Sequence, residues 1–233
     1  MNCQFCNNSL EKVFIDLGEL PSANRLVRFD QLKLKETRFS HKVFICDECL
    51  LVQIPALHKA HDMFTKNYVY FSSFARSWVE HARKYVDKMT NQMRLGANSF
   101  VVEIASNDGY LLQHFVNRNI PCLGIDPAAN CANEAYNKGV ETRIEFFTSQ
   151  SAQALSAQKG QADLILGNNV FAHVPDVNDF IAGISILLKS DGILTLEFPH
   201  LAQMIKNNQF DTIYDEHFCY FSFQVAQKIL ARH

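Results

Sequence analysis

The sequence has no strong excess of charge of either sign and no long apolar run. Its 233 residues include 22 basic and 24 acidic side chains, for a formal net charge of -2. This balance gives no electrostatic reason to expect nucleic acid or an anionic membrane as a partner. No apolar run approaches the ~18 residues of a membrane span, and the first residues do not resemble a secretory signal. We therefore expect a cytoplasmic protein.

Cysteine is the residue whose pattern is most specific. The count is seven, which is odd, and this argues for reduced thiols and against a disulfide framework. Four of them form two Cys-x2-Cys pairs, Cys3 with Cys6 and Cys46 with Cys49. Two such pairs make a tetrahedral four-sulfur cage that suits a structural Zn²⁺ ion. An iron site of the rubredoxin kind, and two pairs of buried free cysteines, are the alternatives.

Three segments of the chain differ in pattern. Residues 1–60 contain both cysteine pairs and short β-type runs, and we expect a small zinc-binding domain that needs its metal to fold. Residues 61–93 are expected to form a helical connector, because apolar residues recur there at helical spacing. In residues 94–233 strands and helices alternate, which predicts an α/β fold with a parallel sheet covered on both faces. The expected strands are 100–104, 122–125, 163–166 and 193–197, and the expected helices are 110–117, 128–138, 180–188 and 224–232.

Glycine is sparse in the first strand-to-helix loop of this region. A dinucleotide-binding fold needs three spaced glycines there to approach a pyrophosphate, whereas the loop from Glu103 offers only Gly109. S-adenosylmethionine carries no phosphate, so one glycine and a few polar side chains suffice. Glu103 and Asp108 are expected near its amino and sulfonium end, and Asp126 near the ribose. The further expected cofactor contacts are Ala105, Asn107, Asn168 and Asn169.

Two other segments contain candidate substrate residues. His217 is a candidate general base because the pKa of histidine lies near working pH, with Tyr214 and Glu216 to orient it or to bind substrate. By residue chemistry alone, a packed or surface histidine is the favoured interpretation. The segment with Tyr68, Tyr70 and Ser72 has two interpretations: it closes over the substrate, or it packs the domains together.

Taken as a set, these residues resemble the sugar 3-C-methyltransferases of deoxysugar pathways, which have an amino-terminal zinc-binding domain. The resemblance rests on both cysteine pairs, Asp16-Leu17-Gly18 with Pro21 and Asn24, Leu51-Val52-Gln53, Tyr68-Val69-Tyr70 with Ser72-Ser73, Glu103 to Gly109, and Tyr214 to His217. It implies a Rossmann-like class I methyltransferase sheet behind the zinc domain. Two departures stand out: Ala105 replaces a usual glycine, and two closing strands and a further carboxy-terminal domain are expected beyond the last helix. The C-terminal part is therefore expected to be missing; the alternative is that the sheet is completed in another way.

The resemblance also implies a reaction. The substrate is a nucleoside-diphosphate 4-keto-deoxysugar, methylated at C3 through an enolate, with His217 as the base. Tyr214 and Glu216 lie beside it, and His173 and Tyr68 contact substrate or enolate. The alternatives are methylation of an oxygen or nitrogen acceptor and a non-catalytic interaction module; an oxidoreductase is disfavoured by the single glycine in the loop.

Overall fold

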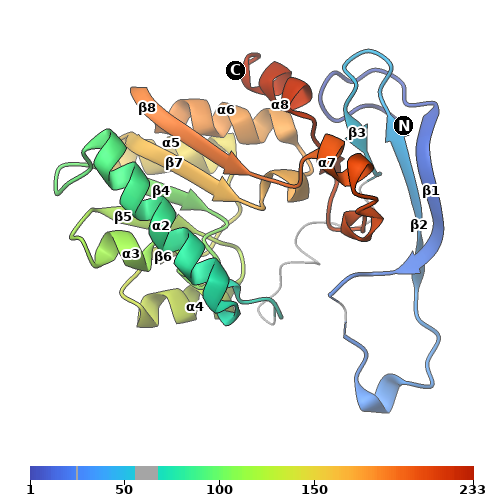
Figure 1. The fold of residues 1–233 in the computed structure, drawn as a ribbon, viewed down its shortest axis with the longest axis horizontal. Coiled ribbons are helices and arrows are strands. Elements are labelled where there is room, and N and C mark those ends of the chain that lie inside the picture. Colours follow the sequence, from blue (N-terminus) through green and yellow to red (C-terminus); the bar gives the residue numbers. More distant parts are fainter. Residues whose placement is uncertain (25, 56–67) are drawn as a thin grey trace. The chain divides into compact units, whose positions relative to one another are not determined.

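The computed structural model describes residues 1–24, 26–55 and 68–233. The chain divides into two compact units, coloured along the sequence in Figure 1. The first unit comprises the described residues of Met1–Met63 together with Phe171–Asn178 and Phe198–His233, and the second comprises those of Phe64–Val170 with Asp179–Glu197. The predicted boundary at residue 60 lies outside the described residues, and the division into three segments stays a prediction.

The second unit is an α/β layer structure around a five-stranded parallel sheet. Its strand order is β6-β5-β4-β7-β8. The strands are β4 (Val101–Ile104), β5 (Cys122–Ile125), β6 (Thr142–Arg143), β7 (Ala162–Asn168) and β8 (Leu188–Glu197). The strand order reverses at β4, which has β5 on one side and β7 on the other. In open α/β sheets ligands bind at the carboxyl ends of the strands beside such a reversal. The predicted α/β class is confirmed.

Helices cover both faces of this sheet. Figure 1 shows α2 crossing one face, with α6 behind the strands. The helices are α2 (Arg76–Met93), α3 (Gln113–Val116), α4 (Ala129–Asn137), α5 (Ser149–Lys159) and α6 (Val177–Leu187), which begins two residues before this unit. One buried cluster joins α2 and α3 to the strands and consists of Ala82, Val86, Met89, Leu95, Val101, Tyr110, Leu111, Leu112, Phe115, Ile120, Ala135, Val140, Leu164 and Leu166. Burial of these side chains is the main stabilising term for the unit.

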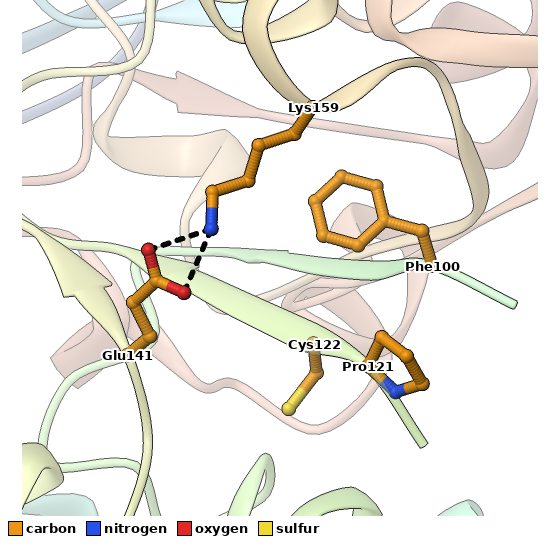
Figure 2. Close-up of a pocket in the computed structure, with 5 residues that line it drawn as sticks. All are labelled: Phe100, Pro121, Cys122, Glu141 and Lys159. Atoms are coloured by element: carbon orange, nitrogen blue, oxygen red, sulfur yellow. Dashed lines mark hydrogen bonds and ion pairs between the residues drawn. The ribbon is translucent and has the colours of Figure 1, made fainter. Parts of the chain in front are cut away.

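A cavity of about 380 Å³ lies at the amino ends of the strands. Phe100 and Pro121 lie directly before β4 and β5, and Cys122 begins β5 (Figure 2). Glu141 and Lys159 close its polar side with contacts of 2.7 and 2.8 Å between the carboxylate and the ammonium group. Since these two charges neutralise one another and the cavity lies at the opposite ends of the strands from the loops that follow them, it contributes nothing to the predicted site.

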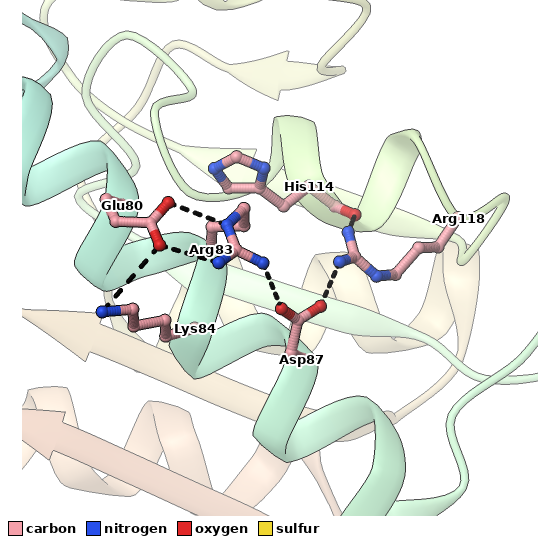
Figure 3. A network of polar contacts seen from close by, with 6 residues as sticks. All are labelled: Glu80, Arg83, Lys84, Asp87, His114 and Arg118. Atoms are coloured by element: carbon pink, nitrogen blue, oxygen red, sulfur yellow. Dashed lines mark hydrogen bonds and ion pairs between the residues drawn. The ribbon is translucent and has the colours of Figure 1, made fainter.

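A chain of ion pairs fastens α2 to the turn after α3 (Figure 3). Arg83 contacts Glu80 at 2.7 Å and Asp87 at 2.6 Å, and Asp87 also pairs with Arg118. His114 lies beside this network, and burial lowers the pKa of its imidazole. Exposed ion pairs contribute little individually, so the network supports the apolar packing of α2 and does not replace it.

The first unit contains a four-stranded antiparallel sheet of order β1-β2-β3-β9. Its strands are β1 (Lys12–Pro21), β2 (Arg38–Ile45), β3 (Val52–Gln53) and β9 (Cys219–Tyr220). β9 comes from the far end of the chain and pairs with β3 through Val52 with Tyr220 and Gln53 with Cys219. After β8, therefore, the next strand joins the antiparallel sheet, and the described residues place five strands in the parallel one.

Short helices complete the first unit. They are α7 (Leu201–Lys206), α8 (Phe223–Leu230) and 3₁₀ turns at Phe29–Gln31, Phe171–His173 and Phe210–Thr212; a fourth turn, Ser72–Phe74, belongs to the second unit. Leu201 and Met204 of α7 pack with Val43, Val52 and Tyr220 of the sheet. The carboxy-terminal segment thus shares a core with the cysteine-bearing segment. Among the described residues, none of the helices has the length and apolar character of a membrane span.

Candidate functional site

The two cysteine pairs form matching knuckles. The carbonyl of Cys3 accepts from Asn7 N–H and that of Cys46 from Leu50 N–H, both at 2.9 Å. Asn7 and Leu50, each four residues after the first cysteine of its pair, have φ of +62° and +67°. Because Leu50 has this left-handed conformation, at a cost of roughly 1–2 kcal/mol, it belongs to the knuckle turn, and β3 begins after it at Val52. The knuckles therefore share one backbone turn.

The four thiols form a closed cage. All four Sγ atoms lie within 4.8 Å of one another, and the Cys3–Cys49 and Cys6–Cys46 sulfurs are 3.5 Å apart. Tetrahedral Zn–S bonds of ~2.3 Å would separate the sulfurs by ~3.8 Å, so the donor set fits a zinc ion. Gln53, which is buried, donates from Nε2 to Cys3 Sγ at 3.2 Å. Such an outer contact orients a ligating thiolate.

In the second unit, the loop after β4 has left-handed residues at alternate positions. Ala105, Asn107 and Gly109 have φ of +57°, +49° and +72°. Ala105 adopts the conformation that the glycine usual in the resembling family favours, at a cost of roughly 1–2 kcal/mol. At Gly109 a Cβ atom would lie 3.1 Å from Ala135 and Val140. Glycine is therefore required there both by the positive φ and by the close packing against α4 and the segment that follows it.

Three carboxyl groups gather at this loop. Glu103 is fully buried, and neither of its oxygens has a hydrogen-bond partner among the described residues. Burial, with the nearby charges of Asp126 and Asp108, raises the pKa of Glu103 well above its usual range. Burial likewise raises the pKa of Asp126 to about 6, against the lowering effect of hydrogen bonds from Ala128 and Asn107 N–H. A buried acid without partners is costly, so the cluster, through Glu103, is suited to a cationic ligand.

S-adenosylmethionine fits this chemistry because its amino and sulfonium groups are positively charged. Glu103 has both oxygens available for it. Asp126 receives 2.8 Å hydrogen bonds from Asn107 and Ala128 N–H, so it also organises the loop. Asp108 pairs with Lys138 at 2.8 Å and with the Ser73 hydroxyl, while its Oδ1 has no partner within the described part of the chain. The three predicted acids therefore lie together but have different surroundings.

The predicted substrate segment is tied to the same loop. Asn107 accepts from Ser72 N–H at 2.9 Å and donates to the Tyr70 carbonyl at 3.1 Å. Asn130 of α4 donates to the Tyr68 carbonyl at 2.8 Å. Tyr70 is exposed, whereas Tyr68 is half-buried. Sequence reasoning placed Asn107 at the cofactor but missed this second contact, because a side chain that bridges two loops leaves no periodic signal.

The two predicted asparagines lie at the end of β7: Asn168 is the last residue of the strand and Asn169 is the first residue after it. Asn168 donates from Nδ2 to the Tyr110 hydroxyl at 3.2 Å. Asn169 has φ of +53°, and its N–H donates to the Glu197 carbonyl at 2.7 Å. Both residues therefore lie at the carboxyl ends of β7 and β8, the edge at which the parallel sheet binds ligands.

In the first unit, His217 and Tyr214 form a hydrogen-bonded pair. His217 Nδ1 lies 2.8 Å from the Thr212 carbonyl, which can only accept, so Nδ1 carries the proton. Nε2 then holds the lone pair and accepts from the Tyr214 hydroxyl at 2.9 Å. Burial lowers the pKa of His217 to about 4, against the raising effect of Thr212. The imidazole is therefore a neutral base at neutral pH.

His173 packs against this pair. Its ring centroid lies 4.6 Å from that of His217, at an interplanar angle of 73°. Burial lowers the pKa of His173 to about 3, with a smaller contribution from repulsion by the protonated form of His217, and a hydrogen bond to the Glu216 backbone opposes this. His173 is therefore also neutral at neutral pH. Two neutral histidines and a tyrosine thus provide proton donors and acceptors without a fixed charge.

The acidic residues between Tyr214 and His217 are held by a turn that follows β1. Asp215 accepts from the Ser22 hydroxyl at 2.6 Å and from Ala23 N–H at 2.9 Å. The Asn24 amide donates to both Glu216 oxygens, at 3.0 and 3.1 Å. Sequence reasoning missed these contacts; the only signal was that Asn24 belonged to the family resemblance.

The chain matches two family models. Residues 3–64 match one described as "Putative zinc binding domain", and residues 70–232 match one described as "Methyltransferase domain". The chain belongs to this methyltransferase family. The solved structures of similar fold include a SAM-dependent methyltransferase from Archaeoglobus fulgidus, 14% identical with a TM-score of 0.53, covering 64% of this chain and 67% of that one. The PH0226 protein from Pyrococcus horikoshii OT3 is 13% identical with a TM-score of 0.56, covering 70% and 85%.

A curated relative of this methyltransferase is closer in sequence. The C-methyltransferase NovU from Streptomyces niveus is 36% identical over 220 residues, covering 94% of this chain and 52% of the relative. The chain therefore spans about half the length of that protein. The predicted family, the S-adenosylmethionine-dependent fold and a zinc-binding cysteine domain are confirmed. The roles assigned to individual residues stay predictions.

Proposed function

We propose that this methyltransferase transfers a methyl group to carbon C3 of a nucleoside-diphosphate 4-keto-deoxysugar. The similarity to a protein named as a C-methyltransferase supports carbon as the acceptor. The observation that carries the proposal is the Tyr214–His217 pair, because a neutral, buried base next to a hydroxyl is suited to removing a carbon-bound proton.

Proton removal is the step for which the first unit is equipped. The C3–H bond breaks, its electron pair forms the C3–C4 double bond, and the C4 ketone oxygen becomes the enolate oxygen. The Tyr214 hydroxyl takes the C3 proton as its own proton passes to His217 Nε2, because that nitrogen already accepts from it at 2.9 Å. His173, beside His217, is assigned to contact the substrate or its enolate.

Methyl transfer uses the cofactor bound in the second unit. When bound, S-adenosylmethionine supplies an electrophilic methyl group, to which C3 bonds as the C4 ketone re-forms and S-adenosylhomocysteine leaves. Glu103 compensates the positive charge of the cofactor, while Asp126, Asn168 and Asn169 contact its nucleoside. Tyr68, Tyr70 and Ser72 are assigned to the sugar nucleotide, and the four cysteines to structural zinc. A cytoplasmic location belongs to the same proposal.

The experiment is hydrogen exchange at the sugar. The protein is incubated in D₂O with S-adenosylhomocysteine and thymidine-diphosphate 4-keto-6-deoxyglucose, and proton NMR follows the hydrogens on both carbons next to the ketone, C3 and C5. We expect enzyme-dependent loss of the C3 signal, abolished in His217→Ala and retained in the exposed control His233→Ala. Loss of the C5 signal alone would show that the proton is removed from C5, which would contradict C3 as the reacting carbon.

The same assay separates the alternative acceptors. Cofactor binding without exchange at either carbon would favour an oxygen or nitrogen acceptor, because neither needs an enolate. Neither exchange nor cofactor binding by a folded, zinc-loaded sample would favour the interaction module. Equal zinc content and equal S-adenosylhomocysteine affinity in His217→Ala would show that the variant is folded.

A further inference from the structure

The turn at residues 22–24 connects the zinc-binding segment to the acid–base cluster. It follows β1 directly, and its contacts to Asp215 and Glu216 span 192 and 193 residues of sequence. Asp215 and Glu216 are both buried. A segment assigned only to holding metal would not need to place hydrogen-bond donors on two buried carboxyl groups beside a base.

A second connection runs through the backbone. β3 begins three residues after Cys49, and its pairing with β9 continues as a 3.0 Å hydrogen bond from Ile54 N–H to the Phe218 carbonyl. Phe218 directly follows His217. The second cysteine knuckle is therefore joined by a short run of backbone to the segment that holds the base, and the turn at 22–24 fixes the same segment from its acidic side.

The side chain of Asn24 is suited to binding a carboxylate. Its amide nitrogen can only donate, and it donates to both Glu216 oxygens, which selects the ionised form of that group. Its φ of +55° is a conformation in which asparagine is enriched among the non-glycine residues. Both the side chain and the backbone conformation therefore favour asparagine at this position.

The charge of Glu216 bears on the base. Burial weakens His217 as a base because an imidazolium is poorly solvated there, and an ionised Glu216, the preceding residue in the chain, would offset that cost. Burial raises the pKa of Glu216 to about 7, Asn24 opposes this, and the charge of Asp215 adds to it. Asp215 is the titratable group whose charge acts on Glu216, His217 follows Glu216 directly in the chain, and the His173 ring hydrogen-bonds to the Glu216 backbone.

We propose that Asn24 is a positioning residue, which fixes the Glu216 carboxylate within the Tyr214–His217 segment and favours its ionised form. The zinc-binding segment then takes part in proton removal as well as in folding. This inference rests on the proposed function, because it assigns a role within the same reaction. Asn24 acts through Glu216 and itself needs no contact with substrate.

The test compares two asparagine-to-glycine variants. Asn24→Gly deletes the amide while keeping a residue that accepts the positive φ. Asn208→Gly is the matched control, because Asn208 is exposed, has φ of +52°, and lies in the same unit outside the cluster. The C3 exchange rate in D₂O with bound S-adenosylhomocysteine is measured against pH for both, and for Glu216→Gln with and without Asn24→Gly. Zinc content checks folding.

We expect Asn24→Gly to slow exchange at neutral pH roughly 3- to 10-fold, the scale of one lost hydrogen bond. Its pH profile should shift upward, because Glu216 without its donor ionises at higher pH, while Asn208→Gly matches the wild type. In the Glu216→Gln background the effect of Asn24→Gly should vanish. An unshifted profile, or an effect that persists without the Glu216 carboxylate, would overturn the inference and leave the proposed function standing.

If the wild type shows no exchange, the proposed function fails and the inference is decided separately. Infrared difference spectra against Glu216→Gln then follow the Glu216 carboxyl band with pH. A higher pKa of Glu216 in Asn24→Gly than in the wild type would show that Asn24 controls the charge of Glu216. Identical titrations in Asn24→Gly and the wild type would overturn it.

Discussion

Substitution of Glu103 by glutamine tests the cofactor site most simply, since it removes a charge and keeps the shape of the side chain. Glu103 is fully buried with both oxygens unpartnered among the described residues, and Asp108 and Asp126 lie near it. If its carboxylate binds a positive group of S-adenosylmethionine, the variant loses a charge-assisted hydrogen bond of about 1.5–3 kcal/mol. The dissociation constant should then rise about 10- to 150-fold.

The sign of the pH dependence follows from the raised pKa of Glu103. The free protein holds a proton on this group above the usual pH range of glutamate, and a bound cation favours its release. S-adenosylmethionine affinity should therefore rise with pH, and binding should release protons. The unliganded Glu103→Gln protein should be at least as stable as the wild type, because an amide replaces a buried acid that lacks partners.

Calorimetry in buffers of different ionisation enthalpy measures both the affinity and the protons released. Glu134→Gln on exposed α4 surface is the matched control. S-adenosylhomocysteine keeps the amino group but lacks the sulfonium charge, so an equal loss for both ligands would assign Glu103 to the amino group. A loss confined to S-adenosylmethionine would assign it to the sulfonium. Unchanged affinity for both, with no proton release, would refute the reasoning.

Three further predictions concern the first unit. Cys46→Ser should lose the metal and destabilise the sheet formed by β1, β2, β3 and β9; metal analysis measures the first effect and circular dichroism the second. A retained zinc ion would show that the cage does not depend on this thiolate. Tyr214→Phe should slow C3 exchange roughly 10²- to 10⁴-fold, the range for a positioned acid–base group; wild-type exchange would exclude the hydroxyl from proton transfer. In the wild type the exchange rate should rise with pH around the Glu216 pKa of about 7, because ionised Glu216 stabilises the imidazolium form of His217. Glu216→Gln should remove this rise; a rise that persists in the variant would belong to another group.

The sequence was sufficient for the parts of the fold that depend on local pattern. Continuous apolar runs with polar ends predicted β4 and β5 to within one residue, and α4 was predicted with one extra residue at each end. The cysteine spacing predicted the cage, because a knuckle is a local turn whose two thiolates point the same way. These elements are fixed by interactions within a few residues, so their signals survive in a single chain.

Other elements carried weaker signals. α5 was not predicted, because its apolar residues do not gather on one face; its start is fixed by a capping box between Thr148 and Ser151. The predicted helix 110–117 was too long, since its first residues form turns before α3. Turns and caps decided these boundaries, and both leave less trace in hydrophobic spacing than a buried helix face does.

The contacts that build the candidate acid–base cluster lay beyond local pattern. β9 is two residues long and pairs with β3 across most of the chain, and Asn24 reaches Glu216 over 192 positions. No periodicity links such residues. The sequence named Tyr214, Glu216 and His217 as a group, but the tautomer of His217 required the position of the Thr212 carbonyl.

The central claim, transfer of a methyl group to carbon, is tested most directly by the position of the new methyl group. S-adenosylmethionine labelled with ¹³C in its methyl group is incubated with the protein and thymidine-diphosphate 4-keto-6-deoxyglucose, and carbon–proton NMR correlates the label with the sugar. We predict a ¹³C-methyl signal joined directly to C3 and absent without enzyme. A labelled methyl group on an oxygen, or none in a zinc-loaded sample that binds the cofactor, would contradict the account.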